Sequence, residues 1–555
     1  MLNDKNVYKN DAINRYMDEL CTRVAAESGI PSDRYHFGKL VLRSLKDDPD
    51  FIMQIDGGTG ESETNASVLK RSIKCTTVLK KLGLNVGDVI ILMGTNNLDQ
   101  AIPFYAALFE GYIIAAIDRS LVLNELKATF EVDKPKVIFC QDNKVADVKK
   151  AIELAKLEAK IISYDGSTES DVISFSDMME KYGDDIDVND YKAADFDPDK
   201  TIACIIATSG STGLPKAAII THQGATKNTG NIACYRGNEK PEPTLALILS
   251  PLQWLSALAH YLAGPIFKYP RLQTSKELDA QHIFELINNY KPSFTVYSPP
   301  MLILLLKAAE RIKCDFSCFD VLYLGGSAVP DFLFDKLKEV SPNTLVGNTY
   351  GMSELGSIAM NPFFAPRGSC GRRFAHIEYK LVDVDTQEEV TEPNKVGELW
   401  LRTSSGFKGY YNCPEVSAKV ITPDGWYKTG DLFYFDEDMY GYFVERLKHL
   451  LKYRNHQISP VELEAVIHTL PGVVNVAVSG VPDEECGELP IAFVLPRPGV
   501  DITEQEVKDV VKENLTDSKQ LRGGVVFVKD LPLLPNSKVD RKQLKKIAAS
   551  LAKNA

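Results

Sequence analysis

The chain has 555 residues, of which 44% are hydrophobic and 25% are charged, and its formal net charge is −12 at pH 7. This is the composition of an ordinary globular protein whose length suggests several domains or subdomains. The acidic balance argues against a nucleic-acid-binding surface and gives no attraction to anionic membranes, so we expect no nucleic-acid partner.

No part of the sequence predicts a membrane anchor or an export signal. The densest apolar run, residues 301–306, is far shorter than a transmembrane helix. The polar, acid-containing N-terminus is unlike a signal or transit peptide, and the last four residues, AKNA, are not a Ser-Lys-Leu peroxisomal address. The ten cysteines form no Cys-x-x-Cys pair, so we expect reduced, mostly buried thiols. We therefore expect a cytoplasmic protein.

Most of the chain alternates short β-branched runs with amphipathic stretches, a pattern typical of α/β layers. We expect strands at residues 89–93 and 136–140, and helices at 145–157 and 279–290. Residues 165–199 are acidic and poor in apolar side chains, which predicts an exposed connector.

The most informative segment follows this connector. Buried strands are predicted at 201–207 and 217–221, and a polar loop joins them. Glycines let a backbone approach a ligand closely, hydroxyls donate to anionic oxygens, and a lysine supplies a positive charge suited to phosphate. The loop therefore predicts a phosphate site, although a plain polar turn has a similar composition. It is not a Walker A loop, whose spacing differs. Its residues are Thr208, Ser209, Gly210, Ser211, Thr212, Gly213, Leu214, Pro215 and Lys216.

The composition changes near residue 445, where a compact unit with an αββα-like pattern begins. Pro460 would begin a helix, which is a favourable position for proline because its missing N–H has no helical partner there. Thr503 and Glu506 have the spacing of a capping box. We expect a large domain over residues 1–445 and a small domain over 446–555. The elements expected in the small domain are a helix at 460–469, a strand at 473–479, a helix at 503–515 and a strand at 524–528.

The nine-residue loop resembles the signature of the adenylate-forming, or AMP-binding, superfamily. This superfamily includes acyl-CoA synthetases, coumarate–CoA ligases, insect luciferases and the adenylation domains of peptide synthetases. Further segments resemble its motifs in the same order over roughly residues 75–545. The resemblance implies an α/β fold with a large, multi-subdomain N-terminal adenylation domain and a small α+β C-terminal lid domain.

The resemblance implies a nucleotide site built from several of these segments. Tyr350 would stack on adenine, Asp431 would accept hydrogen bonds from the ribose hydroxyls, and Glu354 would help to hold Mg²⁺. Taken alone, each short segment is equally typical of a polar turn. The other nucleotide contacts implied are Thr208, Ser209, Gly210, Ser211, Thr212, Gly213, Lys216, Gly325, Gly326, Ser327, Asn348, Thr349, Gly351, Ser353, Arg446 and Lys538.

Four basic residues are implied as catalytic, and two of them lie in a hinge segment. Arg446 and Lys216 would bind the nucleotide, and Lys538 would bridge the substrate carboxylate and the α-phosphate during adenylation. Lys452 would enter the site when the lid turns about the pivot Lys448. Without the resemblance, the hinge would be interpreted as a solvated basic face.

An acyl pocket is predicted at Trp254, Ser256, Tyr297 and Ser298, although Trp254 is also a plausible core residue. Asn455, Ser537 and Ala217 stand where relatives commonly carry glycine. Asparagine tolerates left-handed φ better than most residues, so Asn455 puts access of CoA in doubt rather than the fold.

We therefore expect an ATP-dependent carboxylic acid–CoA ligase, an acid–thiol ligase acting through an acyl-adenylate, with ATP, Mg²⁺ and coenzyme A as its cofactors and co-substrates. Two alternatives stay open: a luciferase-like monooxygenase and a non-catalytic nucleotide-binding relative. The acid, fatty or aromatic, and the oligomeric state are not predicted.

Overall fold

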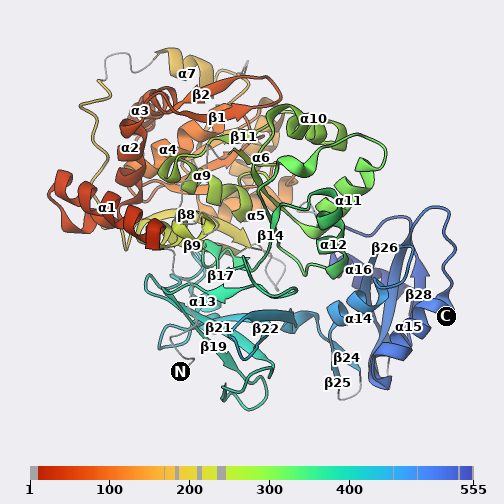
Figure 1. The fold of residues 1–555 in the computed structure, drawn as a ribbon. Coiled ribbons are helices and arrows are strands. Elements are labelled where there is room, and N and C mark those ends of the chain that lie inside the picture. Colours follow the sequence, from red (N-terminus) through yellow and green to blue (C-terminus); the bar gives the residue numbers. More distant parts are fainter. Residues whose placement is uncertain are drawn as a thin grey trace.

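A computed structural model describes residues 11–167, 169–181, 187–208, 216–233, 245–453, 456–483, 486–534 and 538–552. Two seven-stranded and two five-stranded sheets organise the chain (Figure 1). Three of them belong to a large N-terminal part, and the fourth forms a small C-terminal part, coloured blue. The expected α/β architecture, with a large N-terminal and a small C-terminal domain, is confirmed.

The first seven-stranded sheet has the order β7-β6-β5-β3-β4-β8-β9 and is parallel except at the β8–β9 pair. The central strands of this sheet, β3 to β5, are apolar and buried along their whole length, as expected for a sheet covered on both faces. The strands are β3 (Val89–Met93), β4 (Ile113–Ala116), β5 (Val137–Cys140), β6 (Lys160–Ser163), β7 (Val172–Ser174), β8 (Ile202–Thr208) and β9 (Lys216–Thr221).

The second sheet has the order β14-β13-β12-β10-β11-β1-β2 and is parallel except at the β1–β2 pair. Parallel strands place their carboxyl ends at one edge, where ligands bind in open α/β sheets. The strands are β1 (Ile52–Asp56), β2 (Ser62–Thr64), β10 (Ala246–Leu247), β11 (Arg271–Gln273), β12 (Phe294–Tyr297), β13 (Val321–Gly325) and β14 (Leu345–Thr349).

Helices form three layers around these two sheets. One hydrophobic cluster joins residues of both sheets to four helices, which therefore lie between the sheets: α2 (Phe37–Asp47), α3 (Asn65–Lys81), α4 (Ala101–Glu110) and α9 (Leu255–Phe267). A second cluster packs α5 (Leu123–Asp133) and α6 (Val145–Ala155) on the outer face of the first sheet. A third packs α10 (Ala280–Tyr290), α11 (Pro299–Ala309) and α12 (Asp331–Val340) on the outer face of the second. The remaining helices of this part are α1 (Asp11–Ser28), α7 (Phe175–Lys181) and α8 (His222–Asn228).

The third sheet is antiparallel and leads to the C-terminal part. Its order is β20-β19-β21-β22-β23, and β23 ends at Arg446. The strands are β19 (Ile377–Val382), β20 (Glu389–Val390), β21 (Gly397–Thr403), β22 (Tyr427–Phe435) and β23 (Gly441–Arg446). Two short hairpins precede it, β15 (Gly351–Met352) with β16 (Ser357–Ile358) and β17 (Met360–Asn361) with β18 (Arg372–Arg373), and α13 (Pro414–Val420) lies between β21 and β22.

The C-terminal part, which we call the lid, is built on the fourth sheet. Its order is β25-β24-β27-β26, with β28 paired in parallel to β27. The strands are β24 (Leu451–Tyr453), β25 (His456–Ile458), β26 (Val473–Asp483), β27 (Gly487–Pro496) and β28 (Gly524–Phe527), and the helices are α14 (Pro460–Ile467), α15 (Glu504–Asn514) and α16 (Arg541–Ala552). It has hydrophobic clusters of its own.

Most predicted elements lie within one or two residues of the observed ones. Thr503 and Glu506 form the predicted capping box, with both reciprocal hydrogen bonds. The connector prediction for 165–199 is wrong in part, because β7 and α7 lie inside it. Phe175 and Met178 anchor α7, at 2% and 1% exposure. The sparse apolar residues of that segment are thus enough to hold a strand and a helix against the core.

Nine cysteines lie in the described part of the chain, and all nine are free thiols. Among the described residues, no helix combines the length and the apolar character needed to cross a bilayer.

Candidate nucleotide and acyl site

The residues predicted as functional converge where three parts of the molecule meet. The second sheet contributes the carboxyl ends of β13 and β14, at Gly325 and Thr349. The third sheet contributes the ends of β22 and β23, and the lid contributes the segment before α16. The site is therefore built from segments that lie more than two hundred residues apart in the sequence, such as Gly325 and the segment before α16.

A buried carboxylate forms its centre. Asp431 is 1% exposed, and its Oδ2 accepts a hydrogen bond of 2.7 Å from the Tyr350 hydroxyl. Arg446 lies directly opposite in the β22–β23 register, with its Nε 2.8 Å from Asp431 Oδ1. Burial, and then the charge of Asp431, raise the pKa of Tyr350 well above its ordinary value, so its hydroxyl stays a donor. The structure thus brings together three of the predicted nucleotide contacts.

A glycine wall stands beside this centre. A Cβ on Gly325 would lie 2.2 Å from the Thr349 Oγ1, so no side chain fits there. Gly326 has φ of +88°, a conformation that favours glycine, and a Cβ on it would lie 3.2 Å from the Lys538 Cε. Ser327 follows and is exposed. The wall is therefore flat, and a lysine of the lid lies against it.

Lys538 is held in a positive environment. Its pKa is lowered to about 8, first by burial and then by Arg446 and Lys448, while Asp431 acts in the opposite direction. Cations gathered in a partly buried space favour an anionic ligand such as a phosphate. Lys452 lies elsewhere: it is exposed on β24, and its backbone N–H donates to the Glu488 Oε2 at 3.0 Å. The structure brings Lys538 to the site and leaves Lys452 away from it.

Glu354 lies next to a tyrosine that the sequence analysis left out of the site. The Tyr410 hydroxyl donates to the Glu354 Oε1 at 2.7 Å, and the Lys216 Nζ lies 5.5 Å from the centroid of the Tyr410 ring. The charges of Lys216 and Glu354 both act on Lys448. The local signal for Tyr410 is the Gly-Tyr-Tyr sequence at 409–411, which does not by itself indicate a contact with Glu354.

A Mg²⁺ ion fits this donor set only together with phosphate oxygens. The described residues contain no group of three His, Cys, Asp or Glu side chains that could hold a metal. One carboxylate, Glu354, is available, which is the protein share usual for Mg²⁺ bound through substrate phosphates.

Two ends of the phosphate loop are described. Thr208 and Lys216 are paired across the β8–β9 hairpin, and the Thr208 hydroxyl donates to the Lys216 carbonyl at 3.1 Å. The residues between them, Ser209, Gly210, Ser211, Thr212 and Gly213 among the predicted contacts, lie outside the described residues, as do Asn455 and Ser537. The roles predicted for them stay predictions.

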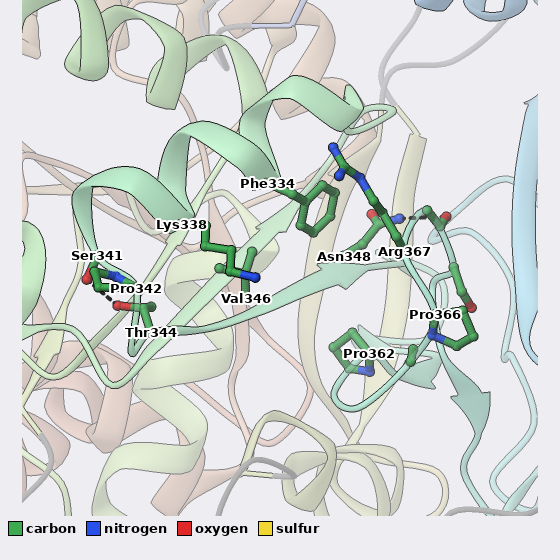
Figure 2. Close-up of a pocket in the computed structure, with 13 residues that line it drawn as sticks. Phe334, Lys338, Ser341, Pro342, Thr344, Val346, Asn348, Pro362, Pro366 and Arg367 are labelled. Carbon is green, nitrogen blue, oxygen red and sulfur yellow. Dashed lines mark hydrogen bonds between the residues drawn. The ribbon is translucent and has the colours of Figure 1, made fainter.

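A cavity of about 350 Å³ meets the site at Asn348 (Figure 2). It lies between α12, β14 and the loop at 362–369, with Phe334 and Arg367 facing each other at one end. The Asn348 amide donates to the Gly368 carbonyl at 3.1 Å. Of the other predicted nucleotide contacts within residues 348–354, Gly351 is exposed and Ser353 is half-buried.

Of the predicted acyl-pocket residues, Trp254 and Ser256 begin α9. Trp254 is half-buried at its N-cap, and the Ser256 hydroxyl donates to the Ser250 hydroxyl at 2.7 Å. Tyr297 is different: it is 1% exposed and belongs to the cluster beneath α11, and its place in an acyl pocket stays a prediction. Ser298 caps α11 by accepting from the Met301 N–H. Strand alternation turns Tyr297 toward the helices on the outer face of the second sheet.

A sequence profile described as AMP-binding enzyme matches residues 42–411, and one described as AMP-binding enzyme C-terminal domain matches residues 462–538. The chain belongs to the AMP-binding enzyme family. The predicted membership in the adenylate-forming superfamily is thereby confirmed. A 4-coumarate–CoA ligase of Vanilla planifolia is 30% identical over 514 residues, covering 90% of this chain and 91% of the relative. A luciferin 4-monooxygenase of Photuris pensylvanica is 29% identical over 500 residues, covering 88% and 90%.

Solved structures of AMP-binding enzymes share the fold. The anthranilate CoA ligase AuaEII, in complex with anthranoyl-AMP, has a TM-score of 0.82 at 20% identity, covering 92% of this chain and 98% of that chain. ATP-bound MatB from Rhodopseudomonas palustris has a TM-score of 0.81 at 22% identity, covering 92% and 99%.

Proposed function

We propose that this AMP-binding enzyme is an ATP-dependent carboxylic acid–CoA ligase, an acid–thiol ligase acting through an acyl-adenylate. One observation carries the proposal: a lid lysine, Lys538, lies over the Gly326 wall beside the Asp431–Arg446 pair. Relatives named as 4-coumarate–CoA ligases, each similar over about nine-tenths of its length, support the choice of reaction.

In the first step an oxygen of the acid attacks the α-phosphorus of ATP, and pyrophosphate leaves. Asp431 would accept hydrogen bonds from the ribose, and Tyr350 would pack on the adenine while its hydroxyl stays on Asp431. Negative charge grows on the α-phosphoryl oxygens, and Lys538 would stabilise it as a fixed cation. Bound beside Glu354, Mg²⁺ would neutralise phosphate charge.

In the second step the CoA sulfur attacks the acyl carbon, and AMP leaves with the bonding electrons. Lys452 is exposed and outside the site in this lid position. A rotation of the lid about Lys448 would withdraw Lys538 and bring Lys452 in, so that one site serves both steps. We propose the domain boundary at this segment, because β23 ends at Arg446 and the lid sheet begins at β24.

The substrate we propose is a fatty or aromatic acid. Benzoate and anthranilate ligases are among the solved structures that share the fold, and coumarate ligases are among the relatives. Trp254 and Ser256 are both half-buried at the start of α9, and we propose that their side chains line the acyl pocket.

Acid-dependent release of pyrophosphate tests the proposal, with and without CoA, over fatty acids of graded length and several aromatic acids. We expect release with at least one acid, and a thioester as the product when CoA is present. Adenylate without any thioester would show that CoA is not the acceptor. No acid-dependent release across the whole panel would overturn the ligase.

A further inference from the structure

A carboxylate of the N-terminal part holds the lid at its first helix. Glu445 lies on β23, three residues before Lys448, and is 1% exposed. Its Oε2 accepts hydrogen bonds from the Ser459 hydroxyl at 3.3 Å and from the Val461 N–H at 3.2 Å. Both donors belong to the N-terminus of α14. A carboxylate at this end of a helix satisfies orphan N–H groups and complements the helix dipole.

Two basic side chains of the lid, His449 and Arg541, act on Glu445, the first through a hydrogen bond and the second through its charge. Its Oε1 lies 3.7 Å from the His449 Nδ1. Burial opposes ionisation of Glu445, but His449, Arg541 and backbone N–H groups outweigh it, so the pKa of Glu445 is held below its ordinary value. The carboxylate is thus charged and tightly bound in this lid position.

Arg541 has a second carboxylate partner that belongs to the lid itself. Its Nη1 and Nη2 each lie 3.0 Å from an oxygen of Glu464, and Nη1 also donates to the Val478 carbonyl at 3.1 Å. This bidentate pair ties the start of α16 to α14. Lys538 precedes α16 by three residues, so the helix that Glu445 holds is linked directly to the lysine over Gly326.

The contacts of Glu445 with α14 cross the hinge, whereas the Arg541–Glu464 pair does not. A turn of the lid about Lys448 moves Ser459 and Val461 away from Glu445, which then faces water. Arg541 keeps Glu464 throughout, so no buried charge is left without a partner. The contacts of Glu445 with α14 therefore exist in one lid position and can be broken reversibly. The Arg446 N–H, which donates to the Glu445 Oε1 at 2.8 Å, belongs to the same strand as Glu445 and does not cross the hinge.

We propose that Glu445 is a positioning residue for adenylation: by holding α14, it fixes Lys538 over Gly326 and favours this lid position over the rotated one. The proposal rests on the ligase function proposed above. Glu445 contacts no reacting atom, so it acts on the two half-reactions in opposite directions. It raises the population of the lid position that forms the adenylate and lowers the population of the one that forms the thioester.

The test separates the half-reactions in Glu445→Ala. We expect ATP–pyrophosphate exchange without CoA to fall about tenfold, the size expected for loss of hydrogen bonds to a charged group. Thioester formation from synthetic acyl-adenylate and CoA should be unchanged or faster. Glu445→Asp keeps the charge and should recover part of the exchange rate. Glu462→Gln is the matched control, because Glu462 is also in the first turn of α14 but pairs within the lid, with Lys519 at 2.6 Å.

Energy transfer between dyes at Lys313 and Lys512, both exposed, reads the lid position directly. Glu445→Ala should shift the transfer efficiency in the ATP-loaded protein, and Glu462→Gln should not. Equal losses in both half-reactions with unchanged transfer would show a merely structural residue and overturn the proposal. So would an unchanged exchange rate. If none of the acids supports ATP–pyrophosphate exchange in the unsubstituted protein, the ligase function fails. The energy-transfer measurement alone then decides on Glu445.

Discussion

Two lysines of the lid, Lys538 and Lys452, share one small domain and differ in nearly everything around them. Lys538 is held over Gly326 with its pKa lowered to about 8, whereas Lys452 is exposed on β24. A rigid body can present only one of its faces to a site at a time. The difference indicates that this lid position is organised for chemistry at the α-phosphate. The face of the lid that carries Lys452 lies outside the site.

The largest effect should come from Lys538→Ala. Loss of the fixed cation at the growing charge should lower ATP–pyrophosphate exchange about 10³-fold, the upper range for removing one such group. Thioester formation from supplied acyl-adenylate should stay within a fewfold of the unsubstituted protein. Lys508→Ala, at an exposed lid lysine paired with Glu504, is the control and should change neither rate. An unchanged rate of ATP–pyrophosphate exchange in Lys538→Ala would contradict the role proposed for Lys538.

The substitution Lys452→Ala should have a smaller effect, and this effect should fall on the other half-reaction. We expect thioester formation from acyl-adenylate to fall about tenfold to a hundredfold, as for loss of a positioned group, with exchange preserved. Rapid mixing of acyl-adenylate with CoA measures the first rate, and isotope exchange measures the second. A fall in exchange would mean that Lys452 serves the same lid position as Lys538.

A pH profile sharpens the contrast further. The pKa of Lys538 is about 8, so this lysine is charged below that pH and loses its charge as the pH rises through it. We expect kcat/KM for ATP, which reports the free enzyme, to fall above about pH 8. Lys538→Arg should have a lower rate but should keep it to higher pH, since arginine stays protonated. A profile that is flat up to pH 10 in both proteins would remove the charge of Lys538 from the mechanism.

The smallest effect concerns the fixed side of the site. Tyr350→Phe removes the hydrogen bond to buried Asp431 and should lower the free energy of unfolding by about 1–2 kcal/mol. Urea denaturation measures it. Tyr442→Phe is the control: its bond to Asp436, 3.2 Å, lies in a half-buried pair on the same sheet and should contribute under about 0.5 kcal/mol. Equal effects would show that burial of Asp431 adds nothing.

Sequence patterns predicted what depends on neighbours in the chain. The apolar run at 89–93, the Thr503–Glu506 cap and the strands around the phosphate loop were all local signals, and the structure has them. The resemblance supplied the candidate residues, and the structure brings Tyr350, Asp431, Arg446 and Lys538 to one place, although their roles remain proposals.

Three features of the site could not be predicted in this way. Tyr410 reaches Glu354 only because the β21–β22 connection folds back over the β8–β9 hairpin, where Tyr410 bridges to Ala218. Glu445 meets α14 across the hinge, a contact set by how two domains pack. The burial of Tyr297 against α11 could not be predicted, because a four-residue strand does not reveal which of its faces meets a cavity and which meets a helix.

The Asp431–Arg446 pairing also limits where residues can be inserted or deleted in this part of the chain. The two residues face each other across β22 and β23, and the ladder already takes up one register shift, between Leu432 and Phe433, on its way to the turn. A further residue gained or lost within either strand would turn its side chains to the opposite face unless the ladder took up a second bulge. Insertions and deletions should therefore be tolerated only in the connection at 436–440, which closes as a turn through the Asp436 and Tyr440 backbone. An alignment of relatives should show its gaps there and none between that turn and either charged residue.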